Sequence, residues 1–270
     1  MIFNAVNFKN INFLTTLFLI SIIVISWVYT IFGIGMDMSA WKMTLMEYNQ
    51  VFVSDNKTTM KDMKTYTFSN QYFISLFFMW TFMMIAMMLP TAYPVFVMYN
   101  KIYKERKENK FNLLNPIFFI TMYMLVWSFF SFLATLLQII LLEYNSFNLS
   151  NFKTTNTISS TLFIFIGIYQ LTPLKNFCLY YCRNPIEILS KLNFNNLSSQ
   201  FTVSYQHALF CLGCCWALML ILFSVGVMNL LWISIIAIYV FFEKNVFRDK
   251  KFDILVGLLL IMFGIYGLVS

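Results

Sequence analysis

The chain has 270 residues, of which 60% are hydrophobic and only 11% are charged, and its mean hydropathy is +0.73. A soluble globular domain is about 45–50% apolar and about 25% charged, so the composition excludes a soluble enzyme, a disordered tail and a coiled coil. The formal net charge is +7, but the basic residues lie mainly in short loops between apolar runs. Membrane topology explains that placement better than nucleic-acid binding does, and we predict an integral membrane protein.

Seven apolar runs are long enough to cross a bilayer, because a helix needs about 17–25 residues to span a hydrocarbon core of about 30 Å. We therefore predict an all-α fold, a polytopic transmembrane bundle of about seven helices that forms one domain over residues 1–270. No charged residue lies between His207 and Glu243, so this stretch must fold back, and we expect the turn near Gly226 and Asn229. A re-entrant pair, which would leave six helices, is the alternative. The runs cover residues 11–35, 72–99, 116–142, 158–180, 205–225, 227–242 and 252–269.

The basic residues predict the orientation of these helices. Thirteen Lys and Arg fall in the loops on one side and five in the loops on the other. The positive-inside rule then places the N-terminus in the cytoplasm and, with seven helices in the cell membrane, the C-terminus outside. Residues 36–70 become an extracytoplasmic loop. Glu243 and Lys244, at the end of the sixth run, are expected to mark the membrane interface.

All five cysteines and the only histidine lie between residues 178 and 215. At 100° per residue, four of these side chains share about 100° of one helix face. Two more cysteines lie four residues apart, just after Pro173, which should kink or end its helix. Thiolate and imidazole are ligands of Cu(I) and Zn(II), so the pattern predicts a soft-metal site, with Cu(I) favoured and zinc as the alternative. The predicted ligands are His207, Cys211, Cys214 and Cys215, with Cys178 and Cys182 as partners from the preceding helix.

Six ligands exceed the number that one such ion takes. Either the chain holds two sites, or some of these residues contact the ligands without binding the ion themselves. The packing alternative is that each cysteine is a small apolar filler. A disulfide is the least favoured interpretation, because thiols on the cytoplasmic side are kept reduced.

Methionine is also frequent, with 18 residues. Thioethers bind Cu(I) without losing a proton, so a ladder of methionines could lead a soft cation inward. The predicted secondary path runs from Met36 and Met38 to a helical stripe of Met79, Met83 and Met87. Met as a filler of irregular gaps between helices is the alternative.

Two sequence blocks resemble the signature of a known family. The first is GIYQLTPLK at residues 167–175, followed by Cys178 and Cys182, and the second is His207 followed by CLGCCWALM at residues 211–219. They are similar to a family of predicted metal-binding integral membrane proteins, a domain of unknown function. Ala208 stands where that family often has a glycine after the histidine. The resemblance covers roughly residues 70–245 and implies metal binding, without supplying a mechanism.

Motifs for other chemistry are not visible in the sequence. It shows no nucleophile with a base, no phosphate-binding loop and no paired intramembrane carboxylates, which argues against ATP-driven transport and favours a protein that is not an enzyme. We expect copper handling, either transport or delivery to a membrane cuproenzyme. The expected partners are the lipid bilayer, the metal ion and a membrane cuproenzyme or metallochaperone, without nucleic acid. A membrane metalloenzyme or redox protein, and a metal-free structural or assembly subunit of a larger complex, are the alternatives.

Overall fold

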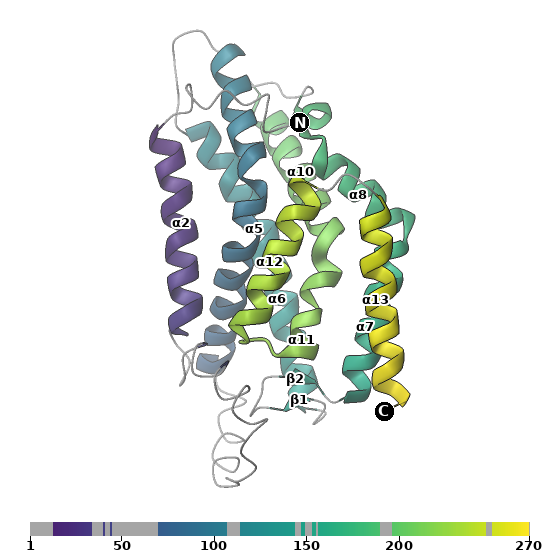
Figure 1. Cartoon of the computed structure of the whole chain (residues 1–270). Helices are drawn as coiled ribbons and strands as arrows, with labels where there is room; N and C mark the ends of the chain where they lie inside the picture. The colour runs from purple at the N-terminus through teal and green to yellow at the C-terminus, as the bar shows by residue number, and fades with distance from the viewer. Residues whose placement is uncertain are drawn as a thin grey trace.

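The structure, a computed structural model, describes residues 13–33, 40, 44, 70–106, 114–143, 147–148, 153–154, 156–189, 196–246 and 250–269. Within these ranges the chain forms a bundle of helices that run roughly side by side (Figure 1). The start of α2 and the end of α13 lie at opposite ends of this bundle. Met36, Met38 and most of the predicted loop 36–70 lie outside the described residues.

Where the structure describes them, the predicted apolar runs lie mainly in helices, so the predicted all-α class is confirmed. Between two of the long helices, β1 (Phe147–Asn148) and β2 (Lys153–Thr154) pair as a short antiparallel hairpin. The helices are α2 (Phe13–Phe32), α5 (Asn70–Arg106), α6 (Leu114–Glu143), α7 (Asn156–Leu171), α8 (Pro173–Arg183), α9 (Pro185–Leu189), α10 (Leu197–Met219), α11 (Ile221–Val225), α12 (Leu230–Asn245) and α13 (Lys250–Val269).

Four helical segments in the described part of the chain are long and apolar enough to cross a membrane, and a fifth joins them if α7 and α8 form one bent span. The α2 helix contributes a shorter apolar segment of 17 residues, Thr16–Phe32. The α12 helix has 16 residues and is only about 24 Å long at about 1.5 Å per residue. It is therefore shorter than a hydrocarbon core of about 30 Å.

Two predicted breaks occur where the sequence places them. Pro173 is the first residue of α8, which bends away from α7 by 63°, and the Thr172 hydroxyl caps the new helix by accepting from the backbone N–H of Lys175 at 3.4 Å. Gly226 has a φ of 105°, a conformation that costs glycine little because it lacks a Cβ. Asn229 then caps α12 by accepting from the backbone N–H of Leu231 at 3.1 Å. The chain thus changes direction at Pro173 and at Gly226, as the sequence predicts.

The α5 helix is apolar, and just over half of its candidate membrane span is buried inside the bundle. Its neighbours include α2, α6 and α12. Trp80 is fully buried, stacks on Phe223 with ring centroids 5.0 Å apart, and donates from Nε1 to Gln138 Oε1 at 2.7 Å. The pairing of Gln138 is typical of a polar side chain inside an apolar bundle.

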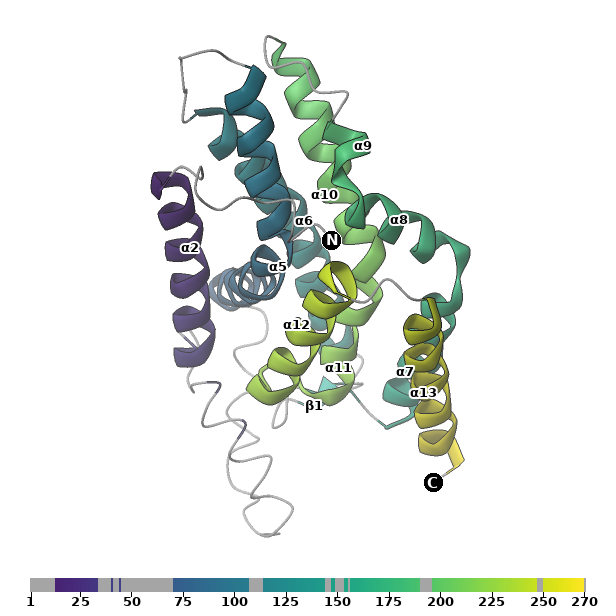
Figure 2. The same cartoon turned by 45° about the horizontal axis from the view of Figure 1, so that its top comes forward.

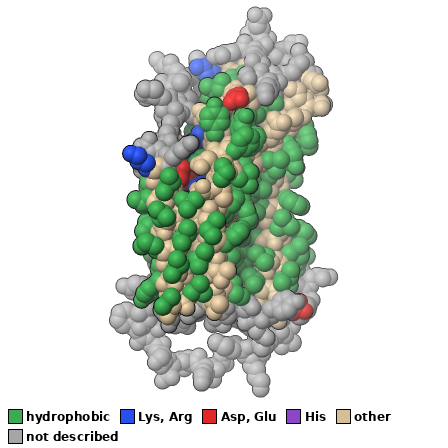
Figure 3. All heavy atoms as spheres, turned by 90° about the vertical axis from the view of Figure 1, so that its right-hand side faces the viewer, with side chains coloured by type: hydrophobic (Ala, Val, Ile, Leu, Met, Phe, Trp, Pro, Cys, Tyr) green, Lys and Arg blue, Asp and Glu red, His purple; other side chains and the backbone are tan. Residues whose placement is uncertain are grey.

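The α7 and α13 helices form a pair at the edge of the bundle, as two views show (Figure 2). Apolar side chains cover most of the face in Figure 3, which fits a surface that meets lipid tails. On α13 the exposed apolar residues include Leu255, Leu259, Met262 and Phe263. What holds α13 to the bundle is therefore mainly its contact with α7.

Gly167 on α7 lets the two backbones approach closely. A Cβ added there would lie 2.6 Å from Ile261 Cγ1 and 2.7 Å from the backbone oxygen of Gly257. Because backbone atoms cannot move aside cheaply, we expect Gly167→Ala to lower the free energy of unfolding by about 1–3 kcal/mol, measured by thermal unfolding in detergent. Leu258→Ala on the exposed side of α13 is the control, and equal midpoints for the two variants would contradict this packing.

Candidate metal centre

Four of the five cysteines meet where α8 packs against α10. Cys211, Cys214 and Cys215 on α10 and Cys182 on α8 are all buried. Cys182 and Cys211 line the same small cavity. The thiols of Cys214 and Cys215 both donate to the backbone oxygen of Cys211, at 3.0 and 2.9 Å. All five cysteines are free thiols, and we call these four the thiol cluster.

The fifth cysteine, Cys178, lies at the edge of this cluster. It is only partly buried and packs on Gly213, where an added Cβ would lie 2.9 Å from its sulfur. The buried face of α8 is instead formed by Lys175, Leu179 and Cys182, which follow one another at helical spacing. Cys178 and Cys182 are thus near neighbours on α8, but only Cys182 turns fully into the bundle.

Lys244 brings a positive charge to the thiol cluster. Its Nζ donates to Cys211 Sγ at 2.9 Å and to Cys215 Sγ at 3.6 Å, and only 6% of the residue is exposed. Glu243 and Lys244, which the sequence predicts to mark the membrane interface, are both buried among the helices rather than exposed, and their depth in a membrane stays a prediction. The reason for their burial is the short α12, which ends below the upper ends of α5 and α10 in Figure 1, so its last turn lies inside the bundle.

Glu243, one residue earlier, belongs to a buried ion pair. Its Oε1 accepts from Lys175 Nζ and, at 2.8 Å, from the Tyr239 hydroxyl. Lys175 also donates to Gln170 Oε1, and Arg183 Nε donates to the backbone oxygen of Glu243 at 3.0 Å. These contacts join the α7–α8 break to the end of α12, and they hold the backbone that carries Lys244.

His207 lies one turn before Cys211 and is 2% exposed. Its ring stacks on Phe119, with centroids 5.8 Å apart, and lies near Tyr123. Its Nδ1 has no hydrogen-bond partner among the described residues. A buried imidazole nitrogen of this kind is available to a ligand that enters beside it.

Tyr123 and Met88 close the cluster on the side of α5 and α6. The Tyr123 hydroxyl lies 3.0 Å from Cys211 Sγ and donates to the backbone oxygen of Met88 at 3.2 Å. The thioether sulfur of Met88 lies 3.9 Å from Cys215 Sγ. None of these three contacts could be predicted from the sequence, because they join segments that are far apart in the chain.

Only part of the predicted methionine path lies among the residues that the structure describes. Met79, Met83 and Met87 are all buried in the core. Met88, which contacts the cluster, lies about 180° around α5 from Met79 at 100° per residue. Met36 and Met38 lie outside the described residues, so the path as a whole stays a prediction.

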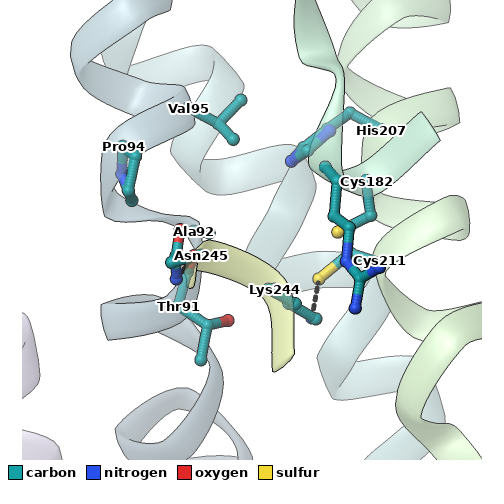
Figure 4. Close-up of a pocket in the computed structure, with 10 residues that line it drawn as sticks. Thr91, Ala92, Pro94, Val95, Cys182, His207, Cys211, Lys244 and Asn245 are labelled. Carbon is teal, nitrogen blue, oxygen red and sulfur yellow. Dashed lines mark hydrogen bonds between the residues drawn. The ribbon is translucent and has the colours of Figure 1, made fainter. Parts of the chain in front are cut away.

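A small cavity of about 10 Å³ opens onto the cluster (Figure 4). That volume accommodates roughly one water-sized particle. Side chains from α8 and α10 face it from one side and those from α5 from the other, with Lys244 between them. The residues that line it include Thr91, Pro94, Cys182, His207, Cys211 and Lys244.

The sulfur and nitrogen atoms at the thiol cluster are of the kind that a soft monovalent ion prefers as ligands. Thiolate sulfur and imidazole nitrogen are the ligands that Cu(I) prefers, and a thioether lies within reach. Across the described ranges, no three His, Cys, Asp or Glu side chains are arranged as a group that could hold a metal ion as they stand. The thiols of Cys214 and Cys215 instead point to a backbone carbonyl, and an ammonium lies against Cys211 and Cys215. Metal binding would therefore require these side chains to rotate.

The comparisons with known proteins point to copper. The profile of one protein family, described as "PpoB2: Copper chaperone", matches residues 77–266. The match covers 190 of the 270 residues and includes every cysteine, His207 and Lys244. No curated protein and no solved structure matches the chain.

Proposed function

The chain belongs to the PpoB2 copper chaperone family, and from this premise we propose that it binds Cu(I) inside its helix bundle and delivers the ion to another protein. The observation that carries the proposal is a group of four buried cysteines, Cys182, Cys211, Cys214 and Cys215, of which Cys182 and Cys211 line a small cavity together with His207. Soft thiolate ligands select Cu(I) over harder ions. The copper ion is here the cargo of the protein.

The surroundings of the thiol cluster suit a protein that must hold Cu(I) and later release it. The cluster lies among apolar and aromatic side chains, which limit the access of water to the sulfurs. Cu(I) needs fewer ligands than the four thiols and one imidazole can supply. Spare donors would let the ion move from one pair of ligands to another as it passes to a recipient.

We further propose that the bundle lies in the cell membrane with the start of α2 on the cytoplasmic side. Four or five helices in the described part of the chain are long and apolar enough to cross a bilayer. Lys and Arg remain more numerous on the predicted inner side even without the buried Lys175 and Lys244, and the positive-inside rule supports this direction. The cavity residue Arg183 and the nearby loops then lie toward the cytoplasm. A membrane cuproenzyme or a metallochaperone is the recipient or donor that this placement supports.

The proposal is tested by the copper content of purified protein. The full chain is prepared in detergent under reducing conditions, offered Cu(I), freed of excess ion and examined by elemental analysis. We expect roughly one or two copper ions per chain, and loss of that copper when Cys211, Cys214 and Cys215 are replaced together by serine.

Serine keeps the size of each side chain but removes the soft donor, so circular dichroism should show the same helical content in both proteins. Equal copper content in the wild type and the folded triple variant would contradict the proposed site. A wild type that binds no copper would contradict the proposed function as a whole.

A further inference from the structure

Lys244 is a buried cation whose polar neighbours include sulfur atoms. The described residues contain two ion pairs, Lys175 with Glu243 and Arg183 with Asp253, and Lys244 is in neither. Its ammonium instead lies 2.9 Å from Cys211 Sγ and 3.6 Å from Cys215 Sγ. A charge held in an apolar interior is costly unless an opposite charge balances it. The ammonium is thus placed to balance negative charge on this pair of sulfurs.

The charges around the pair can be counted for different ions. Two coordinating thiolates carry two negative charges, and Cu(I) and the ammonium carry one positive charge each, so a two-thiolate Cu(I) complex beside Lys244 is neutral. Zn(II) in the same place would leave one positive charge unbalanced. Zn(II) also prefers four ligands in a tetrahedral arrangement, and to become neutral beside the ammonium it would have to remove the proton of a third thiol in the cluster, which Cu(I) does not need to do. Without the lysine the charge balance favours the other ion. The two-thiolate Cu(I) complex becomes an uncompensated buried anion, while the two-thiolate Zn(II) complex becomes neutral.

We propose that Lys244 is a specificity-determining residue, whose fixed positive charge makes the thiol cluster favour Cu(I) over divalent zinc. This inference rests on the proposed copper-binding function. Lys244 does not itself coordinate the ion. It acts through the two sulfurs that it contacts, from the end of α12.

A small cavity next to the ammonium gives an ion access to the thiols. The cavity lies between Cys182, His207 and Cys211 on one side and the α5 residues Thr91, Pro94 and Val95 on the other, with Lys244 beside Cys211, as Figure 4 shows. An ion that enters there reaches the thiols from the side of His207 and Cys182. When the thiol side chains rotate to bind the ion, the ammonium remains next to the complex that it balances.

The test compares the Cu(I) and Zn(II) affinities of the full chain and three variants, measured in detergent by competition with chromophoric chelators. In Lys244→Met, which is similar in length but neutral, we expect Cu(I) affinity to fall at least about tenfold, with a shift of the Cu(I) to Zn(II) affinity ratio toward zinc. Lys244→Arg keeps the charge and should keep the wild-type ratio. Lys244→Gln is neutral but can still donate to sulfur, so it should behave as Lys244→Met and replaces it if that variant does not fold.

The outcomes separate the two proposals. An unchanged affinity ratio in the folded neutral variants, or an equal shift in Lys244→Arg, would overturn the role of Lys244 while leaving copper binding intact. A wild type that binds no Cu(I) would overturn both. A loss of Cu(I) and Zn(II) affinity by the same factor would also overturn the inference, because a merely structural role predicts that result and a charge-based role does not.

Discussion

Replacing Glu243 with glutamine is expected to lower the free energy of unfolding by about 3–5 kcal/mol, because it leaves the buried Lys175 ammonium without its counter-charge. Both side chains are fully buried. Gln170 and the Tyr239 hydroxyl complete the network, but neither carries a charge. Unfolding by heat or denaturant in detergent, followed by circular dichroism, measures the effect.

Three further variants, of which the first is Lys175→Met alone, show whether the loss comes from the ion pair. In Lys175→Met combined with Glu243→Gln both charges are gone, so the double variant should be more stable than the sum of the two single losses implies. Glu143→Gln at the exposed end of α6 is the matched control and should change stability little. Additive losses in the double variant would mean that the two charges do not stabilise each other.

The same ion pair matters for the metal centre because Glu243 precedes Lys244 in α12. The carboxylate and the backbone oxygen of Glu243 are held by Lys175 and Arg183 of α8. Cys182 also comes from α8, on the same buried face as Lys175. One helix thus fixes a thiol of the cluster and, through the ion pair, the lysine that contacts two of the other thiols.

The sequence is sufficient to predict features that depend on local chemistry. Apolar runs of helical length, the break at Pro173 and the turn at Gly226 and Asn229 are all set by residues close together in the chain. Helical periodicity likewise places Cys211, Cys214 and Cys215 near one another, since they lie within four residues. All of these predictions agree with the structure.

Features that depend on packing between distant segments could not be predicted in this way. A lysine and a glutamate at the end of an apolar run are typical of a membrane interface, and only the arrangement of α5, α8 and α10 around the end of α12 shows that they are buried. One signal was available, since the run at residues 227–242 is short for a transmembrane helix. Likewise, no periodicity argument shows that Met88, rather than the stripe on the other side of α5, contacts a thiol.

The two cysteines of α8 offer the sharpest matched comparison in the chain. They are four residues apart, yet Cys182 lies within the thiol cluster while Cys178 packs on Gly213 at its edge. We therefore expect Cys182→Ser to lower the Cu(I) affinity by at least about tenfold, whether the thiol binds the ion itself or supports Cys211 and Cys214. Cys178→Ser should stay within about twofold of the wild type, because surface-side substitutions of similar size cost little.

The comparison is made by competition with a Cu(I) chelator under reducing conditions, with unfolding midpoints measured in parallel. Both substitutions exchange sulfur for oxygen in the same helix, so a general effect on α8 would lower both affinities together. Only an ion-binding site inside the bundle would lower the affinity of Cys182→Ser and leave that of Cys178→Ser nearly unchanged. If Cys178→Ser lost as much affinity as Cys182→Ser, the ion would have to be bound closer to Gly213, on the side of α10 that faces α7 and α8, and the cavity beside Lys244 would not be its binding site.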